Sequence, residues 1–212
     1  MLFEGCNTED DSAFDRLLPP WVRTKSSIHF TPVTVARYAA RMLAPNGGTK
    51  ILDVGAGPGK FCIVAASEVP TGTFVGIEVR PHLSRFAKRM AQRLSIPNVQ
   101  FLRGDAVDLD WSHFDAFYFY NPFGEQIHES AFILDRTIDL DPSKFAHYVR
   151  VVRERLHAAR VGTRVVTYHG FGASPPHGYQ LFDSHEIGSD RLELWVKTRE
   201  RTIEDALFEE GA

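Results

Sequence analysis

A strand, a glycine-rich turn and a helix follow one another without a break between residues 50 and 69. The apolar run 51–54 suits a buried strand, and Gly55, Gly57 and Gly59 then stand at every second position. Glycine lets the backbone turn sharply and lets a ligand lie against bare main chain. The helix-compatible segment 60–69 begins directly after the last glycine. This unit predicts a strand-to-helix turn that serves as a ligand cradle.

Strand-like and helix-like segments alternate as far as residue 168, which predicts a parallel sheet with helices on both faces. Two β-rich segments, 179–187 and 191–198, flank a turn at 188–190 and predict an antiparallel hairpin. We therefore predict an α/β fold with a doubly wound, mainly parallel sheet and a C-terminal antiparallel hairpin. The other predicted strands are 51–54, 73–78, 99–103, 114–120 and 163–168, and the predicted helices are 32–43, 60–69, 83–94 and 144–158.

Composition narrows the class of protein. The 212 residues suit one domain, and 43% apolar and 24% charged residues are ordinary values for a globular protein. The net charge of −3 gives no general attraction to nucleic acid or to an anionic membrane. Two cysteines support neither a disulfide framework nor a zinc cluster. Because the acidic N-terminus does not resemble a signal peptide and no 18-residue apolar run occurs, we expect a cytoplasmic protein without a membrane partner.

Glu78 and the spacing of the glycines indicate which kind of ligand the glycine-rich turn can bind. Glu78 stands 19 residues after Gly59, where doubly wound folds place an acid that accepts hydrogen bonds from ribose hydroxyls. A carboxylate suits this role because it offers two acceptor oxygens. The glycine spacing is G-x-G-x-G, and Lys60 occupies the place next to Gly59, unlike the G-x-G-x-x-G of nicotinamide-binding folds. Glu78 by itself fits any cofactor that carries a ribose.

From about residue 31 to residue 198, the chain resembles the class I methyltransferases that use S-adenosyl-L-methionine (SAM). The resemblance implies a seven-stranded sheet, SAM as cofactor, S-adenosyl-L-homocysteine as product and no metal. It places the glycine loop under the methionine part of SAM, with Asp53 at the ammonium group. It also implies that Asp105 accepts a hydrogen bond from the adenine amino group and that the backbone of Ala106 meets the ring. The nine histidines show no metal-ligand spacing.

A fourth motif, Asn121-Pro122-Phe123, follows the predicted strand 114–120. It resembles the Asn-Pro-Pro-Tyr/Phe motif of amino-directed methyltransferases, which implies a nitrogen acceptor whose hydrogen bonds Asn121 accepts. One proline is missing and Phe123 comes one place early, so the type of substrate stays open. His169 and Tyr168, at the end of the fifth strand, are candidates for a general base if the target must lose a proton.

The segment Phe30-Thr31-Pro32 is similar to the Phe-Thr-Pro of N6-adenine DNA methyltransferases, where it packs over the cofactor. Phe30 and Thr31 are therefore candidate cofactor contacts, while Thr31-Pro32 equally predicts a helix N-cap followed by proline. The six Lys and Arg residues between 80 and 103 suit a solvated helix face better than a phosphate track.

These patterns predict three regions: an N-terminal extension, 1–30, as a candidate cover for substrate or cofactor, the SAM-dependent methyltransferase domain, 31–198, and a charged tail, 199–212. The methyl acceptor is a nucleobase, a protein side chain or a small amine, so nucleic acid and protein are both candidate partners, and the oligomeric state is open. Two other functions use related patterns. One is an NAD(P)-dependent oxidoreductase, and the other is a non-catalytic SAM-binding partner subunit.

Overall fold

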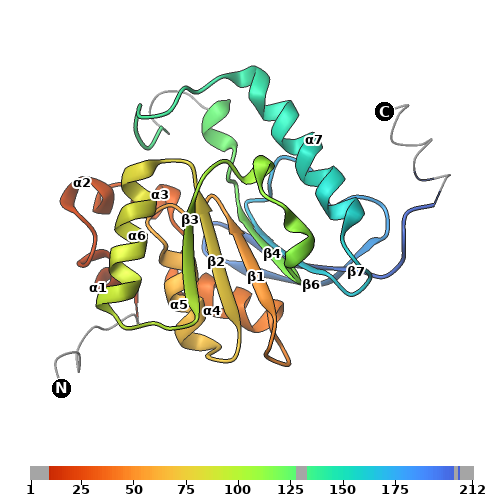
Figure 1. Cartoon of the computed structure of the whole chain (residues 1–212), viewed down its shortest axis with the longest axis horizontal. Helices are drawn as coiled ribbons and strands as arrows, with labels where there is room; N and C mark the ends of the chain where they lie inside the picture. Colours follow the sequence, from red (N-terminus) through yellow and green to blue (C-terminus); the bar gives the residue numbers. More distant parts are fainter. Residues whose placement is uncertain (1–9, 128–132, 203–204, 206–212) are drawn as a thin grey trace.

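The computed structural model describes residues 10–127, 133–202 and 205 and contains a seven-stranded sheet in the order β3-β2-β1-β4-β5-β7-β6 (Figure 1). The five strands from β3 to β5 pair in parallel, and β7 is antiparallel to both β5 and β6. The predicted mainly parallel sheet with a closing hairpin is confirmed. The strands are β1 (Lys50–Val54), β2 (Thr73–Glu78), β3 (Val99–Arg103), β4 (Ala116–Tyr120), β5 (Arg164–Tyr168), β6 (Tyr179–Ile187) and β7 (Asp190–Lys197).

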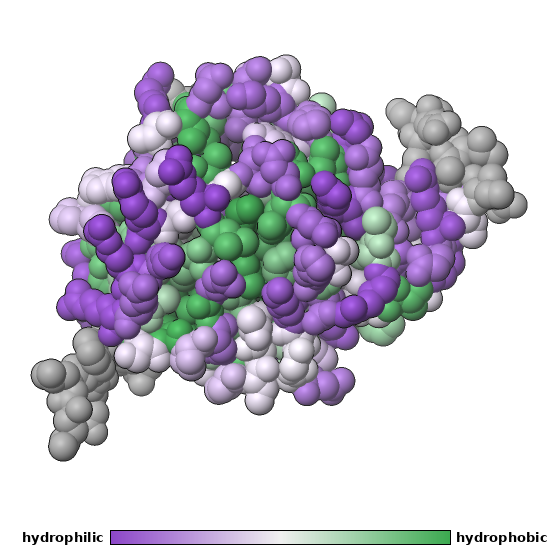
Figure 2. All heavy atoms as spheres, in the orientation of Figure 1, coloured by the Kyte–Doolittle hydropathy of each residue, from purple (hydrophilic) through white to green (hydrophobic). Residues whose placement is uncertain are grey.

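Side chains alternate between the two faces of the sheet, and in the central strands both faces are buried. Ile51 belongs to a hydrophobic cluster that includes residues of three long helices, and its neighbour Leu52 belongs to a second cluster with the fourth long helix. Helices thus lie on both faces, as predicted, and hydrophobic side chains gather in the centre of the face in Figure 2. The first three helices are α4 (Val33–Leu43), α5 (Lys60–Glu68) and α6 (Pro81–Arg93), and the fourth is α7 (Pro142–Ala158).

Short helices complete the covering of the sheet. The turns η1 (Ala106–Asp108), η2 (Trp111–His113) and η3 (Gly124–Gln126) are 3-10 helices on the connections that follow β3 and β4. The side chain of Asp141 accepts a hydrogen bond from the N–H of Ser143 and so caps the N-terminus of α7. No helix of the described ranges is long and apolar enough to cross a membrane.

The described part of the N-terminal extension, 10–30, folds onto the same core. It forms α1 (Asp11–Asp15), α2 (Pro20–Arg23) and α3 (Ser26–His29), although its sequence is only weakly periodic. The ammonium group of Lys60, whose side chain is 2% exposed, lies 2.7 Å from the carboxylate of Asp11 and 2.9 Å from that of Asp15. Lys60, which departs from the nicotinamide pattern, therefore ties the extension to the helix after the glycine loop.

The prediction that Thr31 caps the next helix is wrong. Pro32 occupies the cap position of α4, and the N–H of Val33 donates to the carboxylate of Asp11, 3.0 Å away. The hydroxyl of Thr31 instead lies 3.0 Å from that of Tyr118 inside the core. Pro32 has an extended backbone conformation (ψ 145°), which turns Thr31 inward and leaves the cap to a residue from α1.

The hairpin turn and the basic segment differ in detail from their predictions. The hairpin turn contains only Gly188 and Ser189, because Asp190 already pairs with Ile187 as the first residue of β7. Arg80 does not belong to the exposed basic face of α6, since it is the N-cap residue of that helix and is 6% exposed. The expected charged tail, 199–212, lies mostly outside the described residues, and Asp205 forms an ion pair with Arg199.

Candidate active site

A large cavity lies where the strand order reverses. Strand β1 pairs with β2 on one side and β4 on the other, and open α/β sheets bind ligands outside the carboxyl ends of such strands. The cavity has a volume of about 640 Å³, within the range typical of small-molecule sites. Residues from α3 and from the ends of β1, β2, β3, β4 and β5 line it.

The glycine loop forms the floor of this cavity. Gly55, Gly57 and Gly59 have φ values of +79°, +55° and +88°, a region that favours glycine over other residues. A Cβ at Gly55 would lie 3.0 Å from Pro122, and one at Gly57 would lie 3.2 Å from the ring of Phe30. Close approach by protein groups therefore accounts for part of the pattern. Gly55 and Gly57 line the cavity, whereas Gly59 does not.

Asp53 lies beneath the loop and not in the cavity wall. It is 4% exposed, and the thiol of Cys62 on α5 donates to it over 3.3 Å. Burial raises the pKa of Asp53 to about 7, with a smaller contribution from the charge of Glu78. Alternation along β1 explains the position, because Asp53 shares the face of Ile51, which α5 covers.

Glu78 faces the cavity from the end of β2. Its two oxygens accept hydrogen bonds from the N–H groups of Gly57 (2.9 Å) and Arg80 (2.8 Å). Burial raises its pKa, and both backbone donors and the charge of Arg80 oppose that shift. Each carboxylate oxygen has a second lone pair, so Glu78 can still accept from two neighbouring hydroxyls.

Asp105 and Ala106 also line the cavity, at the end of β3. The carboxylate of Asp105 accepts hydrogen bonds from the N–H of Val107 (3.2 Å) and from the hydroxyl of Tyr148 on α7 (2.7 Å). Tyr148 therefore closes this end of the cavity. Burial and the carboxylate of Asp105 raise the pKa of Tyr148 well above its usual range, so the phenol is the donor.

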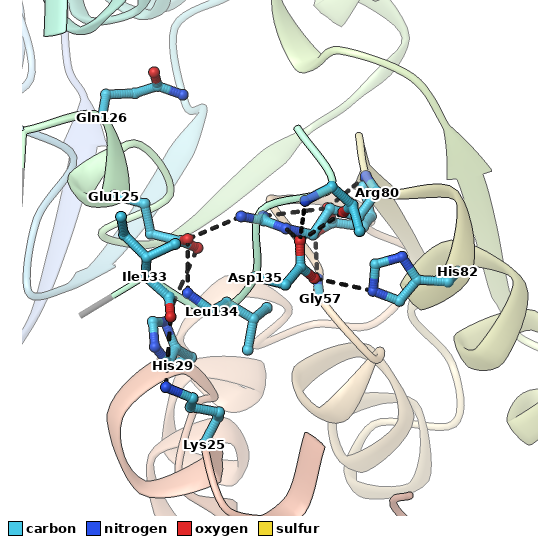
Figure 3. Close-up of polar contacts among 12 residues, drawn as sticks. Lys25, His29, Gly57, Arg80, His82, Glu125, Gln126, Ile133, Leu134 and Asp135 are labelled. Atoms are coloured by element: carbon cyan, nitrogen blue, oxygen red, sulfur yellow. Dashed lines mark hydrogen bonds and ion pairs between the residues drawn. The ribbon is translucent and has the colours of Figure 1, made fainter. Parts of the chain in front are cut away.

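A buried arginine organises the charges beside Glu78 (Figure 3). The guanidinium of Arg80 lies 2.8 Å from the carboxylate of Glu125 in η3, 3.3 Å from Asp135 and 3.8 Å from Glu78. The N–H of Leu134 also donates to Glu125. Burial raises the pKa of Glu125 while Arg80 lowers it. This cluster joins the end of β2 to the segment after β4.

The motif Asn121-Pro122-Phe123 lines the cavity next to the glycine loop. Asn121 has a φ of +39°, and its N–H donates to the carbonyl of Gly170 over 2.9 Å. The ring of Phe123 stacks on Tyr148, with centroids 4.8 Å apart and an interplanar angle of 16°. The aromatic side chain of the motif thus packs against α7.

His169 lines the cavity beside Asn121, at the end of β5. Its Nδ1 lies 2.8 Å from the carboxylate of Asp190, and its Nε2 lies 3.2 Å from the hydroxyl of Ser189. Tyr168, the other candidate base, is 1% exposed and donates its hydroxyl to the carbonyl of Ile187. Of the two, only His169 belongs to the cavity wall.

The N-terminal extension supplies another part of the wall. Residues 27–30 line the cavity, and the hydroxyl of Tyr120 donates to the carbonyl of Ile28 over 3.0 Å. Phe30 lies over Gly57, whereas Thr31 is buried behind it. Burial, Lys25 and Arg80 lower the pKa of His29 to about 4, so this imidazole is neutral near pH 7.

The described residues contain no group of three or more side chains suited to hold a metal ion.

Several residues of the site could not be found from the sequence alone, because their partners are distant in the chain. The spacing of a motif gives no sign of Tyr148, whose contact with Asp105 spans 43 residues. The turn between the last two strands was recognised, but nothing local connects its serine to His169. The residues missed are His29, Arg80, Tyr120, Glu125, Tyr148, Ser189 and Asp190.

Comparison with known proteins identifies the central part of the chain. Residues 45–143 match a family model described as a methyltransferase domain. The release factor glutamine methyltransferase of Vibrio cholerae is 42% identical over 55 residues, which are 26% of this chain and 19% of that protein. The tRNA (guanine-N(7)-)-methyltransferase of Pediococcus pentosaceus is 38% identical over 58 residues, 27% of each chain. The matched regions thus span less than a third of these relatives.

A solved structure extends the likeness to the whole fold. The RNA methyltransferase from Salinibacter ruber, crystallised with S-adenosyl-L-homocysteine, superposes with a TM-score of 0.57 and 23% identity. The superposition covers 82% of this chain and 96% of that chain. At this identity the likeness establishes the fold, which is the seven-stranded, Rossmann-like fold that the sequence predicted.

Proposed function

We propose that this chain, whose residues 45–143 match a methyltransferase domain, transfers a methyl group from SAM to a nitrogen acceptor. One observation carries the proposal: the glycine loop and Asn121-Pro122-Phe123 line the same cavity, and Pro122 lies against Gly55. A ligand on the loop would therefore meet an acceptor held by the motif. We assign the methyltransferase domain to 31–198 and treat 1–30 as a cover, which the wall formed by residues 27–30 supports.

The chemistry of the donor set fits SAM. Gly55, Gly57 and Phe30 offer a cradle, Glu78 keeps acceptor capacity for ribose hydroxyls, and Asp105 with Ala106 suits an adenine. Three of the predicted cofactor residues lie outside the cavity wall: Asp53, Gly59 and Thr31. We assign them a supporting role, in which they shape the surroundings of the loop without contacting SAM. When bound, SAM supplies a methyl group activated by a positively charged sulfur.

The contribution of the protein to the reaction is mainly positional. Holding two reactants at near-attack distance can supply much of the rate acceleration of a group transfer. We assign to Asn121 the role of accepting hydrogen bonds from the acceptor nitrogen and of stabilising the positive charge that develops on it. Pro122 and Phe123 border that position, and His169 is the candidate proton acceptor. The names of the relatives, which include a guanine-N7 and a glutamine methyltransferase, support nitrogen as the acceptor element.

Binding measurements separate the proposal from a nicotinamide-dependent enzyme. We expect titration calorimetry to detect SAM and S-adenosyl-L-homocysteine and to give no signal for NAD. Glu78→Ala should weaken SAM binding, while the control Glu186→Ala, on the exposed hairpin, should leave it unchanged. Binding of NAD in preference to SAM would overturn the assignment.

Turnover separates the enzyme from a non-catalytic SAM-binding subunit. A cytosolic extract incubated with the protein and radiolabelled SAM should acquire label in a macromolecular or small-amine fraction. Treatment with nuclease or protease then identifies which class of acceptor carries it. Tight SAM binding without label in any fraction would favour the non-catalytic alternative.

A further inference from the structure

Ser189, His169 and Asp190 form a chain of polar groups at the acceptor end of the cavity. Nδ1 of His169 lies 2.8 Å from Asp190 Oδ2, and Nε2 lies 3.2 Å from Ser189 Oγ. An ionised carboxylate only accepts hydrogen bonds, so Asp190 favours the tautomer with the proton on Nδ1. The basic lone pair then lies on Nε2, on the side of Ser189, which lines the cavity with His169.

The hydroxyl groups of Tyr168 and Ser189 extend this chain of hydrogen bonds beyond the imidazole. Tyr168 donates its hydroxyl to the carbonyl of Ile187 and accepts from the N–H of Ser189. Because the proton of the Tyr168 hydroxyl is already donated to Ile187, this oxygen can only accept a hydrogen bond from Ser189 Oγ, 3.3 Å away. The hydroxyl of Ser189 can donate to Tyr168 or to His169, and it can exchange protons between the cavity and Nε2.

The backbone holds His169 and Asn121 together under strain. Among the described residues, three non-glycine residues have a positive φ: Ser95, Asn121 and His169. Two of these three follow directly on the paired residues Tyr120 and Tyr168 of neighbouring strands. Such conformations are unfavourable for residues other than glycine and cluster at functional sites. The strain therefore concentrates where the motif residue and the imidazole meet.

We propose that His169, oriented by Asp190 and linked to Ser189, accepts a proton from the methyl acceptor, and that this acceptor is an amine that is protonated in solution. The proposal rests on the proposed function. A proton passes from the ammonium group to Nε2, directly or through Ser189, and leaves the nitrogen with a free electron pair. That pair forms the bond to the methyl carbon, whose bond to sulfur breaks with its electrons retained on sulfur. The imidazolium, paired with Asp190, returns the proton to solvent.

The strength of the base favours an amine over a hydroxyl. An alkylammonium has a pKa of about 10.4, roughly 4 units above that of an ordinary imidazole, whereas the pKa of an aliphatic hydroxyl lies much further above it. A neutral nucleobase nitrogen already carries its electron pair and has no need of the relay before attack. The ring of Tyr120, 5.3 Å from that of His169, and the carboxylate of Asp190 also suit a cationic group.

The titratable groups against His169 come from three strands: Asp190 from β7, Tyr168 from β5 and Tyr120 from β4. Burial, together with Tyr168 and Asp190, raises the pKa of Tyr120 to about 12, so this phenol stays neutral at physiological pH. Asp190 is then the charged partner of the imidazole among these groups. Its replacement by asparagine removes the charge and keeps the size.

The first test needs no substrate. Nitrogen-15 NMR of the histidines, with His169→Gln to assign the signal, should show the proton of neutral His169 on Nδ1. Asp190→Asn should weaken the preference for this tautomer, because the amide can also donate to Nδ1. The control Asp183→Asn, which removes the carboxylate 3.0 Å from the exposed His185, should leave His169 unchanged. A proton on Nε2 in the unmodified protein, or no change in Asp190→Asn, overturns the relay.

The second test follows transfer to the acceptor found in the labelled extract. Asp190→Asn should reduce turnover at pH 7 by about 100-fold, within the usual range for acid–base catalysis, and move the acidic limb of the pH–rate profile. Its affinity for SAM should stay within twofold. Label in protein or small amines supports the proposal, and label lost on nuclease treatment overturns the amine. If SAM fails to bind, the proposed function fails, while the NMR measurement still decides the relay.

Discussion

The cofactor end and the acceptor end of the cavity are built in different ways. The predicted groups of the cofactor end lie at or just after the ends of three strands: the glycine loop follows β1, Glu78 ends β2 and Asp105 lies two residues after β3. The acceptor end combines Asn121 with His169 and with Ser189 from the hairpin turn. Short contiguous motifs suffice to bind a cofactor that does not change, whereas a site assembled from distant segments can differ from one substrate to another. This difference explains why the cofactor was easier to predict than the acceptor.

Arg80 should give the largest effect, because it joins the two ends. Its guanidinium is buried among Glu78, Glu125 and Asp135, and removal of one partner of a buried ion pair costs about 3–5 kcal/mol. We expect Arg80→Met to lower the free energy of unfolding by that amount in urea denaturation. Arg150→Met breaks an exposed pair with Glu154 and should cost below about 1 kcal/mol. Equal losses in both variants would show that the cluster does not join the two ends.

Asp53 should make the stability of the cofactor end depend on pH. Its pKa of about 7 in the folded protein exceeds the 3.8 of the unfolded chain, so folding binds a proton. The stability that it contributes is complete below pH 3.8 and is lost as the pH rises to about 7. The unfolding free energy of the unmodified protein, relative to Asp53→Asn, should fall by on the order of 3 kcal/mol between pH 4 and 8. The exposed Asp108→Asn serves as control, and a difference independent of pH would exclude the shift.

Asn121→Ala should affect the acceptor end alone. Removal of one preorganised hydrogen-bonding group at a reacting centre costs about 100-fold in turnover, or roughly 2.7 kcal/mol. The affinity for SAM in titration calorimetry should remain within a few-fold. The exposed Asn46→Ala is the matched control. Turnover like that of the unmodified protein would remove Asn121 from the acceptor site.

Glu78→Gln should affect the cofactor end alone and produce the smallest change. The amide keeps one acceptor oxygen, and a hydrogen bond to a charged group contributes about 1.5–3 kcal/mol. We expect SAM to bind about 10-fold more weakly, with turnover at saturating SAM nearly unchanged. A loss of turnover with unaltered binding would reverse the roles assigned to the two ends.

Local sequence predicted most of the elements but not their ends. Strands β2, β3 and β6 have the predicted bounds, while α6 begins two residues earlier than expected, at Pro81. Proline at the first turn was a start signal that the hydrophobic pattern alone did not use. Thr31 shows the opposite case, since its local signal for an N-cap yields to a hydrogen bond with Tyr118.

The sequence by itself determined the alternation of strands and helices, the closing hairpin and the glycine turn, because periodicity and backbone preference act within a few residues. Only the tertiary structure decided that Asp53 faces α5, that Lys60 holds the N-terminal helices and that Asp190 and Ser189 meet His169. Those contacts depend on the order of strands in the sheet and on burial. Both are properties of the packed chain, and no short segment carries them.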